Sequence, residues 1–230
     1  MKYDLTQARK CIETLDKRRF DRALLGSGDA FRHIVSLVPL LLHLNHPALS
    51  GYVEDAPAGI ADFILSNYQQ NFLSKEHPEL VEDVQSAVNS DAVFAPILGI
   101  YVMGSFGSIS QTSASDLDIW ICHQDDLSEQ DQQRLAEKTK KISLWASTFH
   151  VEMHFYLMTQ KRFRNERYSD PLTKENSGSA QYMLLLEEFY RSAVRLSGKP
   201  LLWLHLWVED EKQYEAEVAR LVAAGELNPN

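Results

Sequence analysis

Two aspartates one residue apart, Asp116 and Asp118, are separated by ten residues from the preceding pair Gly104-Ser105. Along a strand, side chains two residues apart point to the same face at a separation of roughly 6–7 Å. Two carboxylates placed in this way can share divalent cations, and their hard oxygen atoms favour Mg²⁺ or Mn²⁺. A pair of such ions can stabilise the attacking and leaving oxygens of an in-line displacement at phosphorus. The spacing therefore predicts chemistry on a bound nucleoside triphosphate.

The Gly-Ser pair suits the phosphate groups of such a ligand. Gly104 lets the backbone approach a phosphate closely, and exposed N–H groups at the start of a following helix favour anions. Ser105 adds a hydroxyl donor. Each motif alone is common, because an Asp-x-Asp pair often marks only a solvated strand start. The ordered combination is rarer and favours a nucleotide site.

A third acid, Glu152, lies in another alternating segment, residues 151–157. Period two places Glu152, His154 and Tyr156 on one face of a strand and apolar side chains on the other. If this strand lies beside the strand of the aspartates, Glu152 can join them in binding metal or in activating a hydroxyl group. The alternative is an ordinary surface glutamate on a half-exposed strand.

The surrounding elements predict an α/β fold, in which a mixed β-sheet packs against helices from both ends of the chain. Hydrophobic periodicity predicts strands at residues 98–103, 116–122, 151–157 and 201–208. It predicts helices at residues 4–25, 30–44, 60–73, 79–89, 128–149, 179–197 and 209–224. We expect a mainly helical N-terminal subdomain at 1–95 and a catalytic core with C-terminal helices at 96–230.

Composition excludes several classes of protein. The net charge of −9 over 230 residues argues against a nucleic-acid partner, because nonspecific binding needs a basic surface. No apolar run reaches the roughly 20 residues that span a bilayer, and no secretory signal opens the chain. Two cysteines, Cys11 and Cys122, form neither a spaced metal set nor a disulfide framework. These features predict a cytoplasmic protein.

The motifs resemble the DNA polymerase beta-like nucleotidyltransferase superfamily, whose signature is Gly-Ser, a spacer, Asp-x-Asp and a third acid on a later strand. A more specific resemblance is to the N-terminal catalytic domain of the class I adenylate cyclases of gamma-proteobacteria. It runs along nearly the whole chain and fits least well at residues 54–96. The strings that carry it include Tyr101-Val-Met-Gly-Ser105, Ser115-Asp-Leu-Asp-Ile-Trp-Ile-Cys-His-Gln124 and Leu184-Leu-Leu-Glu-Glu-Phe-Tyr-Arg-Ser-Ala-Val-Arg-Leu-Ser-Gly-Lys199.

The resemblance implies that the chain is a lyase that converts ATP to 3′,5′-cyclic AMP and pyrophosphate. Metal binding and catalysis would then fall to Asp116, Asp118 and Glu152. Nucleotide binding would fall to Gly104, Ser105 and Ser115. Class I cyclases continue into a long regulatory region, so we expect this chain to be the catalytic part. The resemblance also implies control by the sugar phosphotransferase system through that further region.

Cationic side chains should offset the triphosphate charge beyond what metals neutralise. Arg191 and Arg195 stand four residues apart and would share one face of the expected helix, and Lys199 follows its end. The alternative for Arg191 is a surface ion pair with Glu187. Two further candidates lie in a basic loop, Arg162 and Arg164.

Other side chains leave alternatives open. Trp120 shares the face of the aspartates, where it could stack on a base or simply pack in the core. His43 and His46 lack an evident third metal ligand, which favours structural roles. Two rival functions also remain: a nucleotidyltransferase that adenylylates a small molecule or a protein, and a nucleotide-binding module without catalysis.

Overall fold

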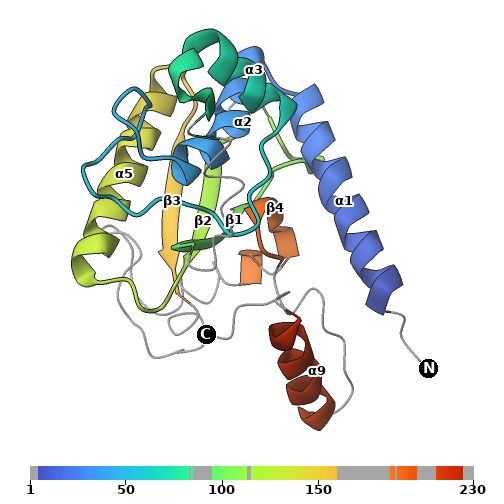
Figure 1. Cartoon of the computed structure of the whole chain (residues 1–230). Helices are drawn as coiled ribbons and strands as arrows, with labels where there is room; N and C mark the ends of the chain where they lie inside the picture. The colour runs from blue at the N-terminus through green and yellow to red at the C-terminus, as the bar shows by residue number, and fades with distance from the viewer. Residues whose placement is uncertain are drawn as a thin grey trace, which may run out of the picture.

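A four-stranded mixed sheet forms the centre of the computed structural model, which describes residues 5–82, 84, 95–112, 115–159, 187–189, 191–200 and 211–224. The strand order is β3-β2-β1-β4. The strands are β1 (Ile97–Met103), β2 (Leu117–His123), β3 (Met153–Met158) and β4 (Val194–Gly198). Helices lie around this sheet (Figure 1). The predicted α/β class with a mixed sheet is confirmed.

The register of the strands decides which residues meet. Strand β1 runs antiparallel to both of its neighbours, and Met103 lies opposite Asp118. Strand β3 runs parallel to β2, with Leu117 opposite Met153 and Asp118 opposite His154. The C-terminal end of β1 and the N-terminal ends of β2 and β3 therefore meet at one edge of the sheet.

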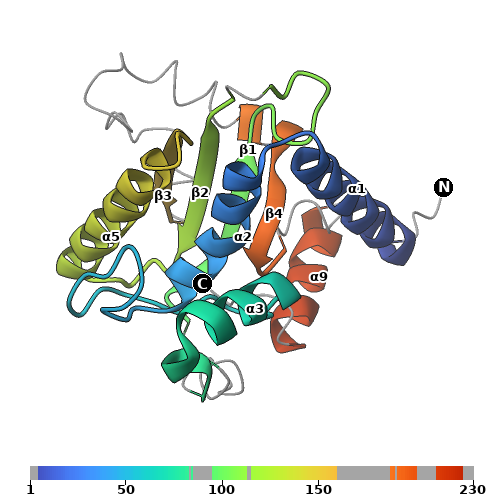
Figure 2. The same cartoon turned by 90° about the horizontal axis from the view of Figure 1, so that it is seen from above.

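The helices fall mostly where periodicity predicts them. They are α1 (Leu5–Leu25), α2 (Asp29–His43), α3 (Asn67–Glu76), the short 3₁₀ helix η1 (Pro78–Leu80), α5 (Glu129–Ser147) and α9 (Glu211–Ala223). Seen from above, α2 crosses the sheet, α5 lies on the β3 side and α1 on the β4 side (Figure 2). No described helix has the length and apolar character needed to cross a membrane.

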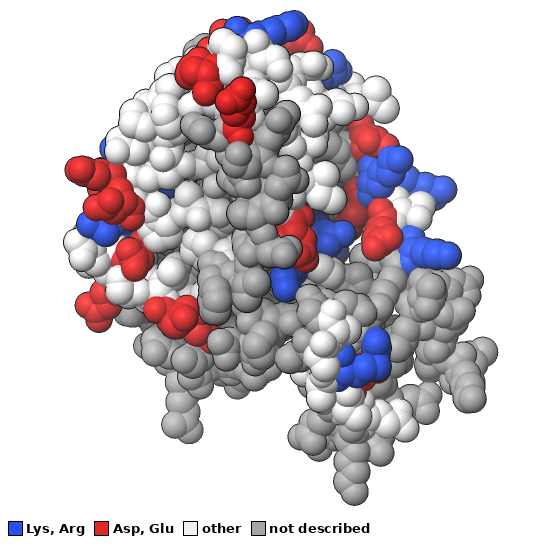
Figure 3. Space-filling model, viewed as in Figure 1, with Lys and Arg blue, Asp and Glu red and all other residues white. Residues whose placement is uncertain are grey.

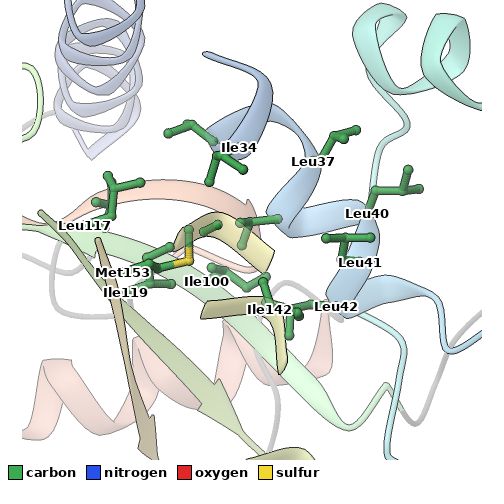
Figure 4. Packing of buried hydrophobic residues seen from close by; sticks show 14 of the residues in the cluster. Ile34, Leu37, Leu40, Leu41, Leu42, Ile100, Leu117, Ile119, Ile142 and Met153 are labelled. Carbon is green, nitrogen blue, oxygen red and sulfur yellow. The ribbon is translucent and has the colours of Figure 1, made fainter. Parts of the chain in front are cut away.

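Helix α2 contributes many residues to the buried apolar cluster that includes the strands. It is apolar on nearly all sides, and its buried residues run from Ile34 to His43. Figure 4 shows Ile34 and Leu41 of α2 in one buried cluster with Ile100 and Ile119 of the sheet. Burying such side chains contributes roughly 1.5–3 kcal/mol each. This helix therefore fixes the position of the strands that carry the predicted site.

Helix α5 covers the same face from the side of β3. Its first turn is capped by Ser128, whose hydroxyl oxygen accepts a hydrogen bond from the N–H of Asp131 at 3.1 Å. Leu135 and Ile142, on one face of the helix, are fully buried, whereas Trp145 is only partly buried. Phe149 lies beyond the helix end and is 37 % exposed. The face of α5 that packs on the core is therefore closed at its centre and more open toward its C-terminal end.

The helix predicted at residues 60–73 is wrong in its first half. Ile60 instead forms an isolated parallel bridge with Ile97, and helix begins only at Asn67. Ser66 caps this helix through a reciprocal pair of hydrogen bonds with Gln69. The stronger local start signal at Ser66, together with the bridge to the sheet, outweighs the apolar spacing upstream.

The helix predicted at residues 179–197 is also wrong at its C-terminal end. Residues 187–189 and 191–192 are helical, but Val194–Gly198 form strand β4. The open edge of β1 is paired by these residues. Gly198 has φ +89°, and a side chain there would lie 2.5 Å from the Cα of Gly99. The glycine expected to end a helix instead lets two strands approach closely.

Several predictions fall outside the described residues. They are the strand at 201–208, the loop with Arg162 and Arg164, and most of the helix at 79–89. The division at about residue 95 stays a prediction, although one cluster of buried residues joins both parts. On the face shown in Figure 3, acidic and basic side chains of the described residues are interspersed rather than gathered into a basic surface.

Candidate active site

The three predicted acids lie at neighbouring positions on one edge of the sheet. Asp116 directly precedes β2, Asp118 is its second residue, and Glu152 directly precedes β3. The N–H of Leu117 donates to the carbonyl oxygen of Glu152 at 2.9 Å, which places Glu152 beside Asp116. The expectation that the strand of Glu152 lies next to that of the aspartates is confirmed. Their catalytic roles stay predictions.

His154 stands between two of these acids. Its Nε2 lies 3.2 Å from Oε1 of Glu152 and 4.0 Å from Oδ2 of Asp116. All three side chains are open to solvent, with exposed fractions of 47 % for His154, 74 % for Glu152 and 54 % for Asp116. Among the described residues, no three His, Cys, Asp or Glu side chains are grouped closely enough to hold a metal ion. Joint metal binding by the acids would require their exposed side chains to turn toward one another.

Asp118 is more enclosed than the other two acids. Burial raises the pKa of its carboxyl above the ordinary value, and the charge of Asp116 adds to this effect. The hydroxyl of Tyr156 donates to Oδ1 of Asp118 at 3.3 Å. Burial, followed by the charge of Asp118, raises the pKa of Tyr156 to about 12, so this phenol stays protonated and can donate. The carboxylates of Asp116 and Asp118 repel each other, and a bound cation would relieve this repulsion.

The turn after β1 brings the Gly-Ser pair to the same edge. Gly104 has φ +79°, a conformation that favours glycine. Because Met103 pairs with Asp118, Gly104 and Ser105 follow directly beyond the aspartate strand. Ser115 has a structural contact, since its hydroxyl oxygen accepts a hydrogen bond from the N–H of Thr112 at 2.9 Å. The expected nucleotide-binding residues Gly104, Ser105 and Ser115 thus flank the acids.

A fourth acid, Glu188, was missed by the sequence analysis. A Cβ added to Gly104 would lie 3.5 Å from Oε1 of Glu188. The charge of Glu188 contributes to the raised pKa of both Asp118 and Tyr156. Local spacing could not have placed Glu188 here, because the contact joins residues more than eighty positions apart in the sequence. Tyr156, by contrast, lies on the strand face that period two predicts for Glu152, and the sequence left only its contact with Asp118 unassigned.

The three predicted cations lie at different places. Arg191 forms an ion pair with Glu187, the alternative that the sequence left open, and its side chain is 77 % exposed. Arg195 lies opposite Tyr101 on β4, and its Nη1 donates to the carbonyl oxygen of Gly198 at 3.2 Å. The N–H of Lys199 donates to the carbonyl oxygen of Leu98, at the end of β1 far from Gly104.

This arrangement changes the expectation for the cations. Arg191 and Arg195 do not share a helix face, because β4 begins between them. The guanidinium of Arg195 turns toward Gly198 rather than toward the acids. Of the three, only Arg191 belongs to the helical turn that also carries Glu188.

Of the two alternatives for Trp120, base stacking or core packing, the structure shows core packing. Its side chain is fully buried and stacks on Phe189, with ring centroids 4.4 Å apart and an interplanar angle of 18°. Tyr101 and Met103 belong to the same small cluster. Burial also raises the pKa of the neighbouring Cys122 thiol to about 12, which leaves it protonated and unreactive at neutral pH.

The two histidines near the end of α2 are structural. Nδ1 of His43 accepts a hydrogen bond from the N–H of Ile60 at 3.0 Å, and its ring stacks on Phe63. Nδ1 of His46 accepts a hydrogen bond from the N–H of Ala48 at 3.2 Å. Both lie away from the acids, as the missing third ligand indicated.

Comparison with known proteins gives a consistent result. The adenylate cyclase NT domain family matches residues 4–204. The adenylate cyclases of Haemophilus influenzae and Pasteurella multocida are 63 % and 57 % identical, over 100 % and 99 % of this chain. The chain spans only 28 % and 27 % of the lengths of these two relatives.

More distant matches were also found. The adenylate cyclase of Escherichia coli strain K12 is 39 % identical over 95 % of this chain and 26 % of its own length. A solved structure of spectinomycin adenyltransferase from Enterococcus faecialis, with ATP and spectinomycin, matches with a TM-score of 0.37 and 15 % identity. That match covers 64 % of this chain and 66 % of the other.

Proposed function

We propose that this chain, which belongs to the adenylate cyclase NT domain family, binds ATP and converts it to 3′,5′-cyclic AMP and pyrophosphate. The observation that carries the proposal is that Asp116, Asp118 and Glu152 lie at neighbouring positions beside the Gly104-Ser105 turn, at one edge of the sheet. The activity named for the longer relatives supports it.

The reaction needs one displacement at phosphorus. The ribose 3′-oxygen of ATP forms a bond to the α-phosphorus, the bond from that phosphorus to the pyrophosphate oxygen breaks, and the 3′-hydroxyl loses its proton. Holding the ribose so that its own hydroxyl is in line replaces a second substrate. We assign acceptance of that proton to the exposed carboxylate of Glu152, whose Oε1 lies 3.2 Å from Nε2 of His154.

The Gly-Ser turn would hold the phosphate groups. Ser105 offers both an N–H and a hydroxyl beside Asp118, and Gly104 allows close approach of the backbone. Ser115 would act by holding the backbone that leads into Asp116. Arg191, which lies in the same helical turn as Glu188, would exchange its ion pair with Glu187 for a phosphate oxygen. Phosphate contact by Arg195 or Lys199 stays a prediction that their positions do not support.

The residues fit a divalent cation by donor chemistry. Asp116, Asp118 and Glu152 would hold Mg²⁺ or Mn²⁺ through carboxylate oxygens, the ligands that these ions prefer. When bound, the cation supplies positive charge against the triphosphate and the developing negative charge. Burial and the neighbouring charge of Asp116 both disfavour the ionised form of Asp118, and a bound cation would offset this unfavourable free energy.

Two further properties are proposed from the family resemblance alone. They are a cytoplasmic location and control by the sugar phosphotransferase system through regions that the longer relatives possess.

The test is incubation of the chain with ATP and Mg²⁺ without any acceptor, followed by chromatography of the nucleotides. We expect cyclic AMP and pyrophosphate in equal amounts from the wild type. A second incubation includes a candidate acceptor, and nucleotide transferred to that acceptor with no cyclic AMP in either incubation would instead establish a nucleotidyltransferase. Calorimetric binding of a nonhydrolysable ATP analogue with no turnover in either assay would reject catalysis and leave a binding module.

A further inference from the structure

We propose that Arg19 and Ser192 are positioning residues that hold the Gly104–Gly107 turn in the shape that presents Ser105 to a phosphate group. The inference rests on the proposed function, because it takes the turn as the triphosphate site. It adds two residues that lie far from the turn in the sequence and outside the Gly-Ser and Asp-x-Asp motifs.

Arg19 of α1 joins three distant segments through one side chain. Its Nη1 donates to the carbonyl oxygen of Ser192 at 2.6 Å, and its Nη2 donates to the carbonyl oxygen of Phe106 at 2.8 Å. The guanidinium is partly buried and planar, so its two donors hold the two carbonyls at a fixed relative position. The turn and the residues before β4 are thereby tied to the same helix.

Close packing fixes the turn against α1 as well. Gly107 has φ +66°, and a Cβ added there would lie 2.1 Å from the backbone oxygen of Arg19. The N–H of Gly107 donates to Oε1 of Gln111 at 2.6 Å. Nε2 of Gln111 in turn donates to the hydroxyl oxygen of Ser27 at 3.0 Å, just beyond the end of α1. The C-terminal half of the turn is therefore held at two places.

Ser192 holds the other end of the turn. Its hydroxyl oxygen accepts a hydrogen bond from the N–H of Gly104 at 2.8 Å, and the hydroxyl donates to the carbonyl oxygen of Glu188 at 2.6 Å. Ser192 thus accepts a hydrogen bond from the Arg19 guanidinium at its carbonyl oxygen and one from the Gly104 N–H at its hydroxyl oxygen.

These contacts decide which groups of the turn can meet a ligand. The N–H groups of Gly104 and Gly107 are engaged by Ser192 and Gln111. Within the described part of the chain, the N–H and the hydroxyl of Ser105 make no hydrogen bond. The two flanking amides act as fixed points, and the donors between them are the ones left for a phosphate oxygen. Such pre-organisation raises affinity for the ligand, because the conformational entropy of the turn is already lost before the ligand binds.

The experiment compares Arg19→Gln and Ser192→Ala with Arg18→Gln, a change of an exposed arginine on the same helix. Amide hydrogen exchange of residues 104–111 is measured without nucleotide, with strand β2 (Leu117–His123) as an internal reference. Affinity for a nonhydrolysable ATP analogue with Mg²⁺ is then measured by calorimetry for each variant. Arg19→Lys serves as the conservative variant, because an ammonium group can replace only part of the two-point contact.

We expect exchange in the turn to become at least about tenfold faster in Arg19→Gln, as for loss of hydrogen bonds from a charged group. Exchange in β2 should stay unchanged, and affinity for the analogue should fall by about tenfold or more. Ser192→Ala should show the same pattern to a smaller extent, Arg19→Lys should recover part of both effects, and Arg18→Gln should match the wild type.

Each other outcome counts against the inference in a distinct way. Unchanged exchange in the turn would show that Arg19 and Ser192 do not hold it, whatever the protein does. Faster exchange with unchanged affinity would show that the held shape is irrelevant to the ligand. Equal acceleration in β2 would indicate a general loss of stability. A wild-type chain that binds no nucleotide would reject the proposed function and the phosphate role of the turn, while the exchange data would still report on the tether itself.

Discussion

One face of the sheet is apolar from end to end, whereas the other changes from aromatic to acidic along the same strands. On the first face, Ile119 and Ile121 of β2 are fully buried under α2 and α5. On the second, Trp120 stacks on Phe189, and two residues earlier Asp118 stands half-buried at the edge. The two faces alternate residue by residue, so neighbours in the sequence belong to different environments.

Within strand β2, one face therefore contributes mainly to the stability of the fold and the other carries the residues proposed to act on the nucleotide. Side chains of the covered face contribute by removal from water and by close packing. The acids at the open edge contribute little to folding, because like charges held together are unfavourable. Substitutions at adjacent positions of β2 should therefore affect different properties.

The largest effect is expected from Asp118→Asn. Loss of the charge should lower cyclic AMP formation by about a hundredfold to a thousandfold, the size seen when one preorganised charge-stabilising group is removed. The midpoint of thermal unfolding should stay the same or rise, since a half-buried charge beside Asp116 is removed. Turnover near the wild-type rate would reject the assignment of this residue. Asp116→Asn provides a second, more exposed test of the same edge.

The complementary change on the covered face is Ile119→Ala. It should lower the free energy of unfolding by about 2–5 kcal/mol through lost burial and a cavity. Urea unfolding measures this, with Ile64→Ala as the control, since Ile64 is 83 % exposed and should change stability by less than about 0.5 kcal/mol. If the variant remains folded, its affinity for an ATP analogue should be close to that of the wild type. A strong loss of affinity in the folded variant would break the separation of the two faces.

The buried His43 predicts a pH dependence of the stability of the covered face. Burial lowers its pKa from 6.5 to about 4, so the unfolded chain binds the proton more readily than the folded one between these values. Stability should therefore fall as pH drops from about 6.5 to about 4, by about 3 kcal/mol from this group. The Nε2 atom of His43 has no hydrogen-bond partner among the described residues, which agrees with a neutral ring.

The measurement is urea unfolding of the wild type and His43→Asn at pH 7 and at pH 4.5. Asparagine keeps an acceptor near the N–H of Ile60 but does not titrate. Other titrating groups act equally in both proteins, so the difference between the two pH dependences isolates His43. Identical slopes would show that the ring is protonated freely in the folded protein.

The smallest effect is expected from Tyr156→Phe on the acidic side. The variant loses one hydrogen bond to Asp118, made at 3.3 Å, and should lower the free energy of unfolding by no more than about 1.5 kcal/mol. Cyclic AMP formation should fall only severalfold, because the carboxylate itself remains. A loss as large as that of Asp118→Asn would instead make Tyr156 a direct participant in the reaction.

Local patterns were sufficient for the acids and for the elements that carry them. The alternation in residues 116–122 and 151–157 predicted two strands, one with Asp116 and Asp118 on a face and one with Glu152, His154 and Tyr156 on a face. The sheet register confirms that these strands are neighbours, with Asp118 opposite His154. Helices α1, α2 and α5 also followed from periodicity and end signals. These features depend on residues within one turn or one strand, which a sequence displays directly.

What could not be predicted depends on contacts across long stretches of chain. Strand β4 forms because β1 has an open edge, although the apolar spacing of residues 184–197 also fits a helix. The approach of Glu188 to Gly104 and the tether from Arg19 to Ser192 each join segments more than eighty residues apart. Local periodicity cannot reveal such a pairing. For the same reason, the sequence could not show that Arg195 and Lys199 lie away from the acids.

The central claim is that the acids at this edge of the sheet bind a divalent cation together with a nucleotide. The direct measurement is titration of Mn²⁺ in the presence of a nonhydrolysable ATP analogue, read by the paramagnetic resonance signal of free Mn²⁺ and corrected for uptake by the analogue alone. We predict that the wild-type chain takes up Mn²⁺ and that the folded double variant Asp116→Asn/Asp118→Asn loses this uptake. Equal uptake by the wild type and the folded double variant would contradict the account.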